Sequence, residues 1–221
     1  GKHPLVGMIA GYAGAQGGFS ANVMIAGTDA LLQGITNKVL DGFLTDYSAD
    51  FLHNATAATY GDAFGGKAGE TVRVRDGLYS LELWHGPTSA FKDVALSMLP
   101  RLMTAAREKC GVSDEILILT ATSGDTGKAA MAGFQDVPGT KIIVFYPYGG
   151  VSAVQQRQME TQQGRNVCVC AVRGNFDDAQ TGVKDIFAAV EKAQLLAGKG
   201  VCLSSANSIN IGRLAPQVVY Y

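Results

Sequence analysis

Cysteine and histidine are scarce in this chain of 221 residues, and their spacing excludes two common kinds of site. The four cysteines include no C-x-x-C pair, and the three histidines stand apart from them. Neither a zinc ribbon nor a framework of disulfide bridges is therefore indicated. A reducing, cytoplasmic setting is the expectation.

An excess of either charge is also lacking. Lysine and arginine together number 18 and aspartate and glutamate 19, so the formal net charge is -1. Because binding to nucleic acid or to an anionic membrane needs a strongly basic face, neither is expected as a partner, and a small molecule fits better. Apolar residues make up 47% of the chain and charged residues 17%, which predicts a folded core. The composition does not indicate an oligomeric state.

Long uninterrupted apolar runs are absent too, although residues 1–40 differ from the rest. Eight glycines fall between Gly1 and Gly34, and residues 4–28 carry no charged side chain. A spanning helix needs about 20 mainly apolar residues, and glycine and polar residues interrupt this stretch, so membrane association is not expected. The pattern of a signal peptide is also missing. We expect two regions: a glycine-rich apolar segment over residues 1–40, as a helix or an extension, and a globular region over 41–221.

Strand-like and helix-like patterns alternate after residue 78. Apolar runs of strand length are predicted as strands at residues 81–84, 116–120, 141–146, 166–172 and 201–204. Apolar residues at helical spacing predict helices at residues 91–103, 127–134, 152–162, 178–196 and from 211 onward. Such alternation predicts an α/β fold with parallel strands, open sheets and flanking helices. Ligands of such sheets bind beyond the carboxyl ends of the strands, so the junctions that follow the strands should carry the function.

The first junction, HGPTSAFKD, contains Lys92. Thr88 or Ser89 is a natural N-cap, which predicts Lys92 in the first helical turn, next to Phe91. The helix dipole and burial would disfavour an ammonium group there, so we expect a lowered pKa and an amine ready to attack a carbonyl. On position alone, a solvent-facing lysine beside Asp93 explains the pattern as well.

The second junction, ATSGDTGKA at residues 121–129, could turn backbone N–H groups toward an anion. It is not a nucleotide P-loop, because only two residues separate Gly124 from Gly127 and Ala129 follows Lys128. A plain turn is the other interpretation. The junctions at residues 174–182 and 204–217 also fit helix caps, with Asp177 and Asn210 preceding amphipathic segments.

These junctions together resemble a known family. HGPTSAFKD, with LYSLELWHGPT before it and KDVALSMLPRLM after it, resembles the lysine motif of threonine synthases, and TSGDTG, GNFDDAQTG and SSANSINIGRLAPQ continue the similarity. The resemblance covers residues 42–221, about four fifths of the chain. It implies a fold-type II pyridoxal 5'-phosphate enzyme, similar to the tryptophan synthase β subunit and incomplete here. Asp125 stands where related cofactor loops have asparagine, which favours threonine synthase over cysteine synthase.

The resemblance also implies residue roles. Lys92 is the catalytic residue, which forms the Schiff base with the cofactor and later moves protons at the substrate carbon. The cofactor-binding residues are Lys92, Phe91, Ser123, Gly124, Asp125, Thr126 and Gly127, and the TSGDTG loop also holds the substrate carboxylate. The residues expected to contact the substrate are Thr88, Ser89, Asn207, Ser208, Asn210 and Arg213. The planar guanidinium of Arg213 suits a phosphate, although a salt bridge at the sheet edge explains it equally.

The reaction that the family implies converts O-phosphohomoserine and water to threonine and phosphate, a lyase step of threonine biosynthesis. A phospho-lyase acting on a similar phosphorylated amino alcohol is an alternative. Family members are about twice as long, and the 221 residues include no GNFGN-like loop for the cofactor phosphate, so weak cofactor binding is expected. Residues 1–36, especially GGFSAN and GTDALL, resemble the AbgT family of aminobenzoyl-glutamate transporters. An inactive chimeric fragment and a transporter segment are therefore two further alternatives.

Overall fold

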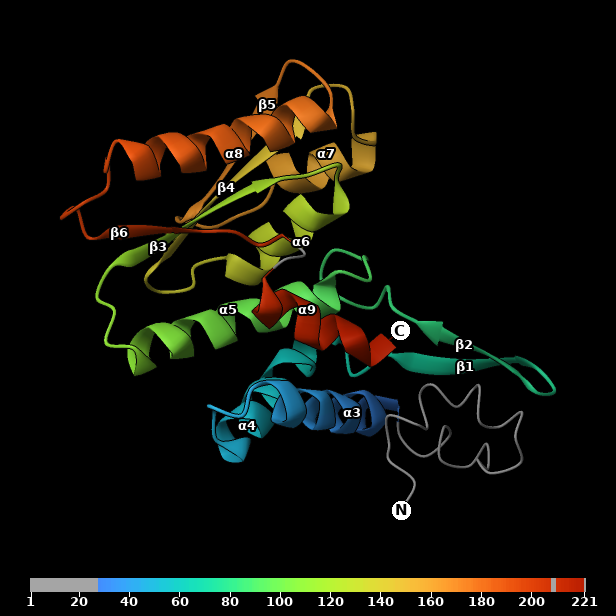
Figure 1. Ribbon diagram of the computed structural model, residues 1–221. Coiled ribbons are helices and arrows are strands. Elements are labelled where there is room, and N and C mark those ends of the chain that lie inside the picture. The colour runs from blue at the N-terminus through green and yellow to red at the C-terminus, as the bar shows by residue number, and fades with distance from the viewer. Residues whose placement is uncertain (1–27, 208–209, 221) are drawn as a thin grey trace. The chain divides into compact units, whose positions relative to one another are not determined.

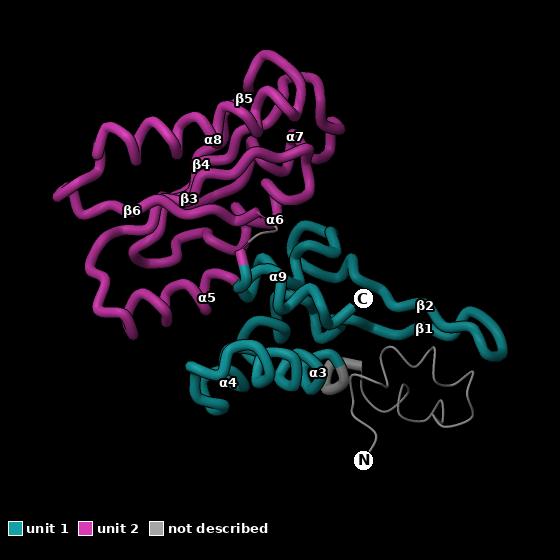
Figure 2. The backbone as a smooth tube through the Cα atoms, in the orientation of Figure 1, with its two compact units in different colours: residues 1–98, 211–221 teal, residues 99–210 magenta. Residues whose placement is uncertain are grey.

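The computed structural model describes residues 28–207 and 210–220. The chain divides into two compact units, which Figure 2 shows in different colours. Unit 1 contains residues up to Met98 together with the C-terminal residues from Ile211, and unit 2 contains Leu99 to Asn210. Helix α5 (Asp93–Lys109) contributes its first residues to unit 1 and the remainder to unit 2.

Unit 1 is mainly helical and carries one antiparallel hairpin. Its elements are α3 (Thr28–Phe43), α4 (Ala49–Thr59), η3 (Asp62–Phe64), β1 (Glu70–Arg75), β2 (Leu78–Glu82), the start of α5, α9 (Ile211–Gln217) and η4 (Val218–Tyr220). Ser48 caps α4, because its side chain accepts a hydrogen bond from the backbone N–H of Phe51. The hairpin turns at Asp76 and Gly77, where Gly77 adopts a positive φ of 71°.

The core of unit 1 joins segments that lie far apart in the sequence. Apolar residues of α3 pack with residues that follow α4, with the start of α5 and with the C-terminal turn; they are Leu32, Ile35, Val39, Tyr60, Phe64, Ala68, Val94 and Val219. The spacing of the three α3 residues places them on one helix face. The hydroxyl of the fully buried Tyr60 donates to the carbonyl oxygen of Val94 at 2.8 Å, so the phenol is satisfied inside this core.

Unit 2 is a four-stranded parallel sheet with helices on both faces (Figure 1). Its elements after α5 are β3 (Glu115–Ala121), α6 (Asp125–Phe134), β4 (Thr140–Pro147), α7 (Ala153–Glu160), β5 (Val167–Val172), α8 (Phe176–Lys192) and β6 (Val201–Ser204). The strand order is β5-β4-β3-β6, and the central strands β3 and β4 carry fully buried residues such as Ile118, Ile142 and Val144. Strands buried on both faces are typical of parallel sheets.

The connections of unit 2 reverse direction once. The chain moves outward from β3 to β4 to β5, and α8 then returns it across the sheet to β6 on the other side of β3. Because such crossovers are right-handed, α8 covers the opposite face from α6, as Figure 1 shows. The chain thus reverses its direction across the sheet between β3 and β6, and ligands of open α/β sheets bind beyond the carboxyl ends of the strands at such a point.

The predicted α/β alternation is confirmed in unit 2, where the strands and helices lie within a few residues of their expected bounds. Two expectations were wrong. The strand expected at residues 81–84 lies at residues 78–82 and does not join the parallel sheet, since β2 pairs antiparallel with β1. Asp177 is not the cap of α8, because Asn175 fills that position and forms a reciprocal capping box with Asp178.

Over the described residues, no helix is both long and apolar enough to cross a bilayer. The part of the expected glycine-rich segment at residues 1–27 lies outside the described residues. The expected division at residue 40 stays a prediction, and helix α3 runs across that position.

Candidate functional site

The segment that carries Lys92 is organised by the carboxylate of Asp93. This side chain is completely buried and accepts three hydrogen bonds: from the Thr88 N–H at 2.9 Å, from the Thr88 hydroxyl at 2.6 Å and from the Ala90 N–H at 3.3 Å. Gly86 approaches the same carboxylate so closely that an added Cβ would lie 2.5 Å from the Asp93 Cβ. The loop between β2 and α5 is thus wrapped around one buried acid.

Lys92 stands directly before α5, not inside its first turn as expected. The helix begins at Asp93, and the carbonyl oxygen of Lys92 accepts the hydrogen bond of the Leu96 N–H at 2.9 Å. Lys92 therefore occupies the N-cap position that was predicted for Thr88 or Ser89. Its side chain is half-buried, with Nζ 5.5 Å from the centroid of the Phe91 ring. The lowered pKa of this amine stays a prediction.

The aromatic ring beside Lys92 is held in turn by the C-terminal turn of unit 1. Phe91 meets Tyr220 edge to face, with the ring centroids 5.9 Å apart. Phe91 remains 36% exposed, so this contact does not cover the whole ring. The backbone around Lys92 is fixed by the hydrogen bonds to Asp93, while Lys92 is half-buried and the neighbouring ring is partly exposed.

The TSGDTG loop of unit 2 is held by a neutral hydroxyl. Thr122, 1% exposed, accepts hydrogen bonds at Oγ1 from the N–H groups of Gly124 at 2.9 Å and Gly127 at 2.8 Å. A Cβ on Gly127 would lie 2.5 Å from the Thr122 side chain, so only glycine allows this approach. Two of the amides expected to face an anion are therefore turned toward a partner within the loop.

The start of α6 is tied to α7 through Gln155. Its Nε2 donates to Oδ1 of Asp125 at 2.9 Å, and the same carboxylate oxygen lies 3.3 Å from Nζ of the buried Lys128. Gly124 has a φ of +132°, and a Cβ there would lie 2.3 Å from the Gln155 side chain. The carboxylate of Asp125 is thus engaged in holding the loop, with Ser123 exposed beside it.

The loop after β6 lies beside the TSGDTG loop at the point where the connections reverse. The backbone N–H of Ala206 donates to Oγ1 of Thr120, near the end of β3, at 3.4 Å. Asn210 donates from Nδ2 to the carbonyl oxygen of Ser205 at 2.9 Å, and Asn207 is exposed. The structure therefore brings the TSGDTG loop together with Asn207 and Asn210 at one edge of the sheet.

The remaining predicted substrate contacts are placed differently. Arg213 belongs to α9 in unit 1, is 5% exposed and donates from Nε to Oε1 of Gln217 at 2.9 Å. Thr88 is 5% exposed, and its hydroxyl is engaged by Asp93. Ser89 has a positive φ of 56° in the same loop. Ser208 lies outside the described residues. Contact of these residues with a substrate stays a prediction.

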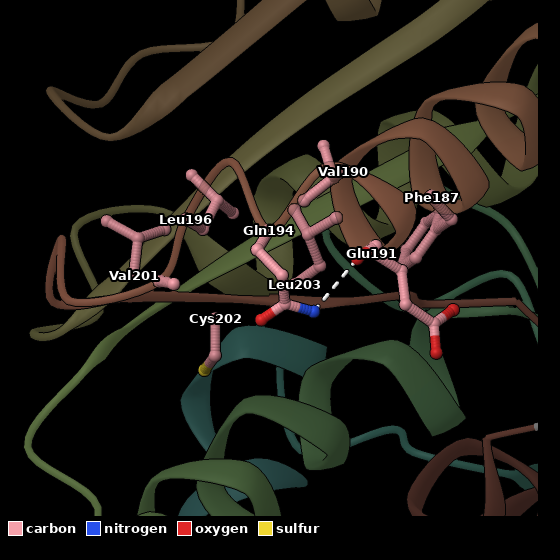
Figure 3. A pocket seen from close by; sticks show the side chains of 9 residues that line it. Phe187, Val190, Glu191, Gln194, Leu196, Val201, Cys202 and Leu203 are labelled. Carbon is pink, nitrogen blue, oxygen red and sulfur yellow. Dashed lines mark hydrogen bonds between the residues drawn. The ribbon is translucent and has the colours of Figure 1, made fainter.

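A cavity of about 380 Å³ in unit 2 lies away from the TSGDTG loop and from the loop after β6 (Figure 3). It is lined by the end of α8, the turn that follows and the first three residues of β6, and the lining includes Phe187, Gln194 and Cys202. The Gln194 side chain donates to the carbonyl oxygen of Glu191 at 2.9 Å across its wall. Because Val201 to Leu203 form the amino end of β6, this cavity is not at the carboxyl edge where ligands of such sheets bind.

Comparison with known proteins gives two different results along the chain. Residues 1–57 match the model of the AbgT putative transporter family, a match longer than the resemblance expected over residues 1–36. Helix α3 and most of α4 fall inside it. The remainder of the chain is similar to proteins of another kind.

Curated relatives and solved structures agree on that second part. The chain is 46% identical over 141 residues to a threonine synthase of Pseudomonas aeruginosa, covering 64% of this chain and 29% of that protein. It is 38% identical over 183 residues to the human threonine synthase-like 1, covering 80% and 24%. The PLP-bound threonine synthase of Brucella melitensis superposes with a TM-score of 0.74 at 37% identity, covering 91% of this chain and 42% of that one.

The chain belongs to the threonine synthase family. The structure of the Escherichia coli threonine synthase supports this at a TM-score of 0.71 and 32% identity, covering 92% of this chain and 44% of that one. The chain thus spans less than half the length of each of these threonine synthases. Residues 42–221 are about four fifths of the chain, so a match over 91% extends into the preceding segment. Part of the transporter-like stretch therefore folds where these threonine synthases also have structure.

Three residues that position the two candidate loops were not predicted from the sequence. Asp93, Thr122 and Gln155 position the two loops, and none was a candidate. Asp93 and Thr122 could have been found, because a short polar side chain within five residues of a glycine-rich turn commonly bonds the turn's own amides. Gln155 could not, because it is 30 residues from its partner Asp125.

Proposed function

We propose that this chain is a piece of a threonine synthase and that Lys92 is its cofactor lysine. The reaction assigned to the complete enzyme converts O-phosphohomoserine and water to threonine and phosphate, a carbon–oxygen lyase step in the cytoplasm. The observation that supports the proposal most is the geometry around Lys92, where a buried carboxylate fixes the backbone and Lys92 itself is half-buried.

The residues around Lys92 fit pyridoxal phosphate by their chemistry. An aldehyde needs an amine that it can reach on a backbone that does not move, and Asp93 supplies that rigidity through three hydrogen bonds. The Phe91 ring next to the amine offers an apolar surface that is partly open. Lys92 would hold the group covalently, with Phe91 beside it. When bound, the cofactor supplies a carbonyl carbon for the amine and a ring that withdraws electrons from the substrate.

The chain's own residues would then have separate roles. Lys92 takes the proton from the α carbon of the substrate, for which a half-exposed amine on a fixed backbone is suited. In the TSGDTG loop, the hydroxyls of Ser123 and Thr126 would hold the substrate carboxylate. Asp125 does not share that task, because its carboxylate has the same charge and is bonded to Gln155. Asp125 is instead a positioning residue.

The test of this proposal is covalent trapping of the cofactor. The purified chain is incubated with pyridoxal phosphate, reduced with borohydride and mapped by peptide mass spectrometry. One adduct on Lys92 is expected. Lys92→Arg should abolish it, while Lys184→Arg, a change at an exposed lysine of α8, should leave it unchanged. An adduct at another lysine, or equal labelling of the Lys92→Arg variant, would reject the assignment.

A product assay separates the two lyase reactions within the family. With O-phosphohomoserine as substrate, threonine and phosphate should appear in equal amounts. A ketone product from a phosphorylated amino alcohol would instead indicate a phospho-lyase. The assay uses the chain loaded with pyridoxal phosphate and left unreduced, with Lys92→Arg as the blank.

A further inference from the structure

A second polar cluster in unit 1 lies where the β1–β2 hairpin joins the segment leading to Lys92. Glu70 begins β1 and Glu82 ends β2, and the register of the antiparallel pair sets these two residues directly opposite each other. His85 follows three residues after Glu82. Its Nε2 lies 2.7 Å from Oε2 of Glu82 and 3.3 Å from Oε2 of Glu70. Among the described residues, these three side chains form a group whose ligand atoms all lie within 4.8 Å of one another.

This arrangement places like charges together without full compensation from the chain. Carboxylates directly opposite each other in an antiparallel ladder destabilise it. Lys67 lies 3.2 Å from Glu70, but its side chain is 56% exposed, so solvent weakens that pair. The His85 Nε2 carries at most one hydrogen, which it can share well with only one of the two carboxylates. A cation bound between the three groups would neutralise the pair more completely.

We propose that Glu70, Glu82 and His85 bind a divalent transition-metal ion of the zinc type. Imidazole favours zinc and similar transition metals over magnesium and calcium. The imidazole nitrogen and one oxygen from each of the two carboxylates would fill three of the four positions around a tetrahedral ion. At metal–ligand distances near 2.1 Å, such ligands stand about 3.4 Å apart. The Nε2 distance to Glu70 already agrees, and the distance to Glu82 needs to open by roughly 0.7 Å, which a partly exposed glutamate allows. Water fills the fourth position.

The metal would join three separate pieces of unit 1 backbone. It would close the base of the hairpin and attach it to His85, whose neighbour Gly86 packs against Asp93. Binding would therefore raise the stability of the segment on which Lys92 stands, since a ligand that binds only the folded state stabilises it. The site itself does not depend on the proposed enzymatic function.

The chain contains a built-in reporter for this site. Trp84 is its single tryptophan, and the Trp84 ring lies 5.7 Å from the ring of His85. The chain is stripped with a chelator and titrated with zinc chloride, with tryptophan fluorescence and calorimetry recorded together. One equivalent should bind, with a saturable change in fluorescence and a rise in Tm.

Variants decide which residues bind the ion. Loss of an outer-shell partner alone costs about 10-fold to 100-fold in affinity, so His85→Gln and Glu82→Gln should each weaken zinc binding by at least about 10-fold. His53→Gln should have no effect, because His53 is the matched histidine that contacts Asp41 elsewhere in unit 1. Replacing both Cys168 and Cys170 by serine should also leave binding unchanged, which excludes the two neighbouring thiols of β5.

Glu70→Gln distinguishes metal binding from a purely structural role. It removes one of two facing negative charges, so the metal-free stability should not fall, while zinc affinity falls at least about 10-fold. Circular dichroism of each variant checks that the hairpin unit remains folded. Absence of zinc binding by the unmodified chain, or unchanged affinity in either folded variant of Glu82 and His85, would overturn the proposal.

Discussion

The two units hold their functional loops by different means. In unit 1 the loop before α5 is wrapped around a charged group, the fully buried carboxylate of Asp93, whereas in unit 2 the TSGDTG loop is wrapped around the neutral hydroxyl of Thr122. Both side chains bond the amides of their own turns. A buried charge depends on its partners far more than a buried hydroxyl does, because desolvation of an ion costs several kcal/mol. Replacing the side chain at the centre of the loop should therefore destabilise the protein more in unit 1 than in unit 2.

The largest effect is expected for Asp93→Asn. A neutral amide oxygen can still accept from the Thr88 and Ala90 N–H groups, but these bonds lose their charge assistance, which roughly halves their strength, and the bond to the Thr88 hydroxyl must reverse its direction because an N–H₂ group only donates. We expect the free energy of unfolding to fall by roughly 3–4 kcal/mol. Urea denaturation measures it, with Asp62→Asn at an exposed position of η3 as the control. A loss no larger than that of the control would remove the contrast between the units.

Thr122→Val should have the next largest effect. Valine keeps the shape of threonine but accepts no hydrogen bond, so the N–H groups of Gly124 and Gly127 lose their partner in a buried position. A destabilisation of about 2 kcal/mol is expected, smaller than that of Asp93→Asn because no charge is involved. The same urea experiment tests the order, and Thr122→Ser, which keeps the hydroxyl, should recover most of the loss.

Gly124→Ala tests the contact between the TSGDTG loop and α7. The added methyl group would meet Gln155 and disturb its bond to Asp125. Gly149→Ala is the matched control, because Gly149 also has a positive φ, of 73°, but its Cβ would meet nothing within 4 Å. The difference between the two variants should be about 1–2 kcal/mol, the usual cost of overpacking. Equal losses would mean that backbone strain alone explains both.

The smallest effect concerns an exposed carboxylate in unit 2. Hydrogen bonds from Gln156 and then from the Tyr146 hydroxyl lower the pKa of Glu160. A lowered pKa in the folded state stabilises the protein above the ordinary pKa of glutamate, and the contribution is lost as the pH falls through the folded value. Tyr146→Phe should raise the Glu160 pKa toward its usual range, as followed by NMR titration. Tyr148→Phe, which changes an exposed ring nearby, should leave that pKa where it is.

Sequence patterns predicted unit 2 better than unit 1, for a physical reason. In unit 2 each strand is an apolar run flanked by an amphipathic helix, so local pattern and final pairing agree. In unit 1 the residues of β2 give a strand pattern, but that pattern does not reveal that the partner is the neighbouring β1 in an antiparallel hairpin. The role proposed for Lys92 could be predicted because the motif that carries it is local. The Gln155 contact and the pairing of Glu70 with Glu82 arise only when distant residues meet.

The packing of α3 has a consequence for how this chain could have arisen. Sequence likeness to transporters runs through residue 57, yet Leu32, Ile35 and Val39 from that stretch fill the same core as Val94, two residues beyond Lys92. The boundary of the sequence similarity to transporters thus differs from the boundary of the folded unit. A recombination event that joined two genes here would succeed only if the incoming helix offered an apolar stripe of the right width, whatever protein it came from. The fit of the apolar side chains in the core, and not the protein from which the helix came, would decide whether the joined chain folds.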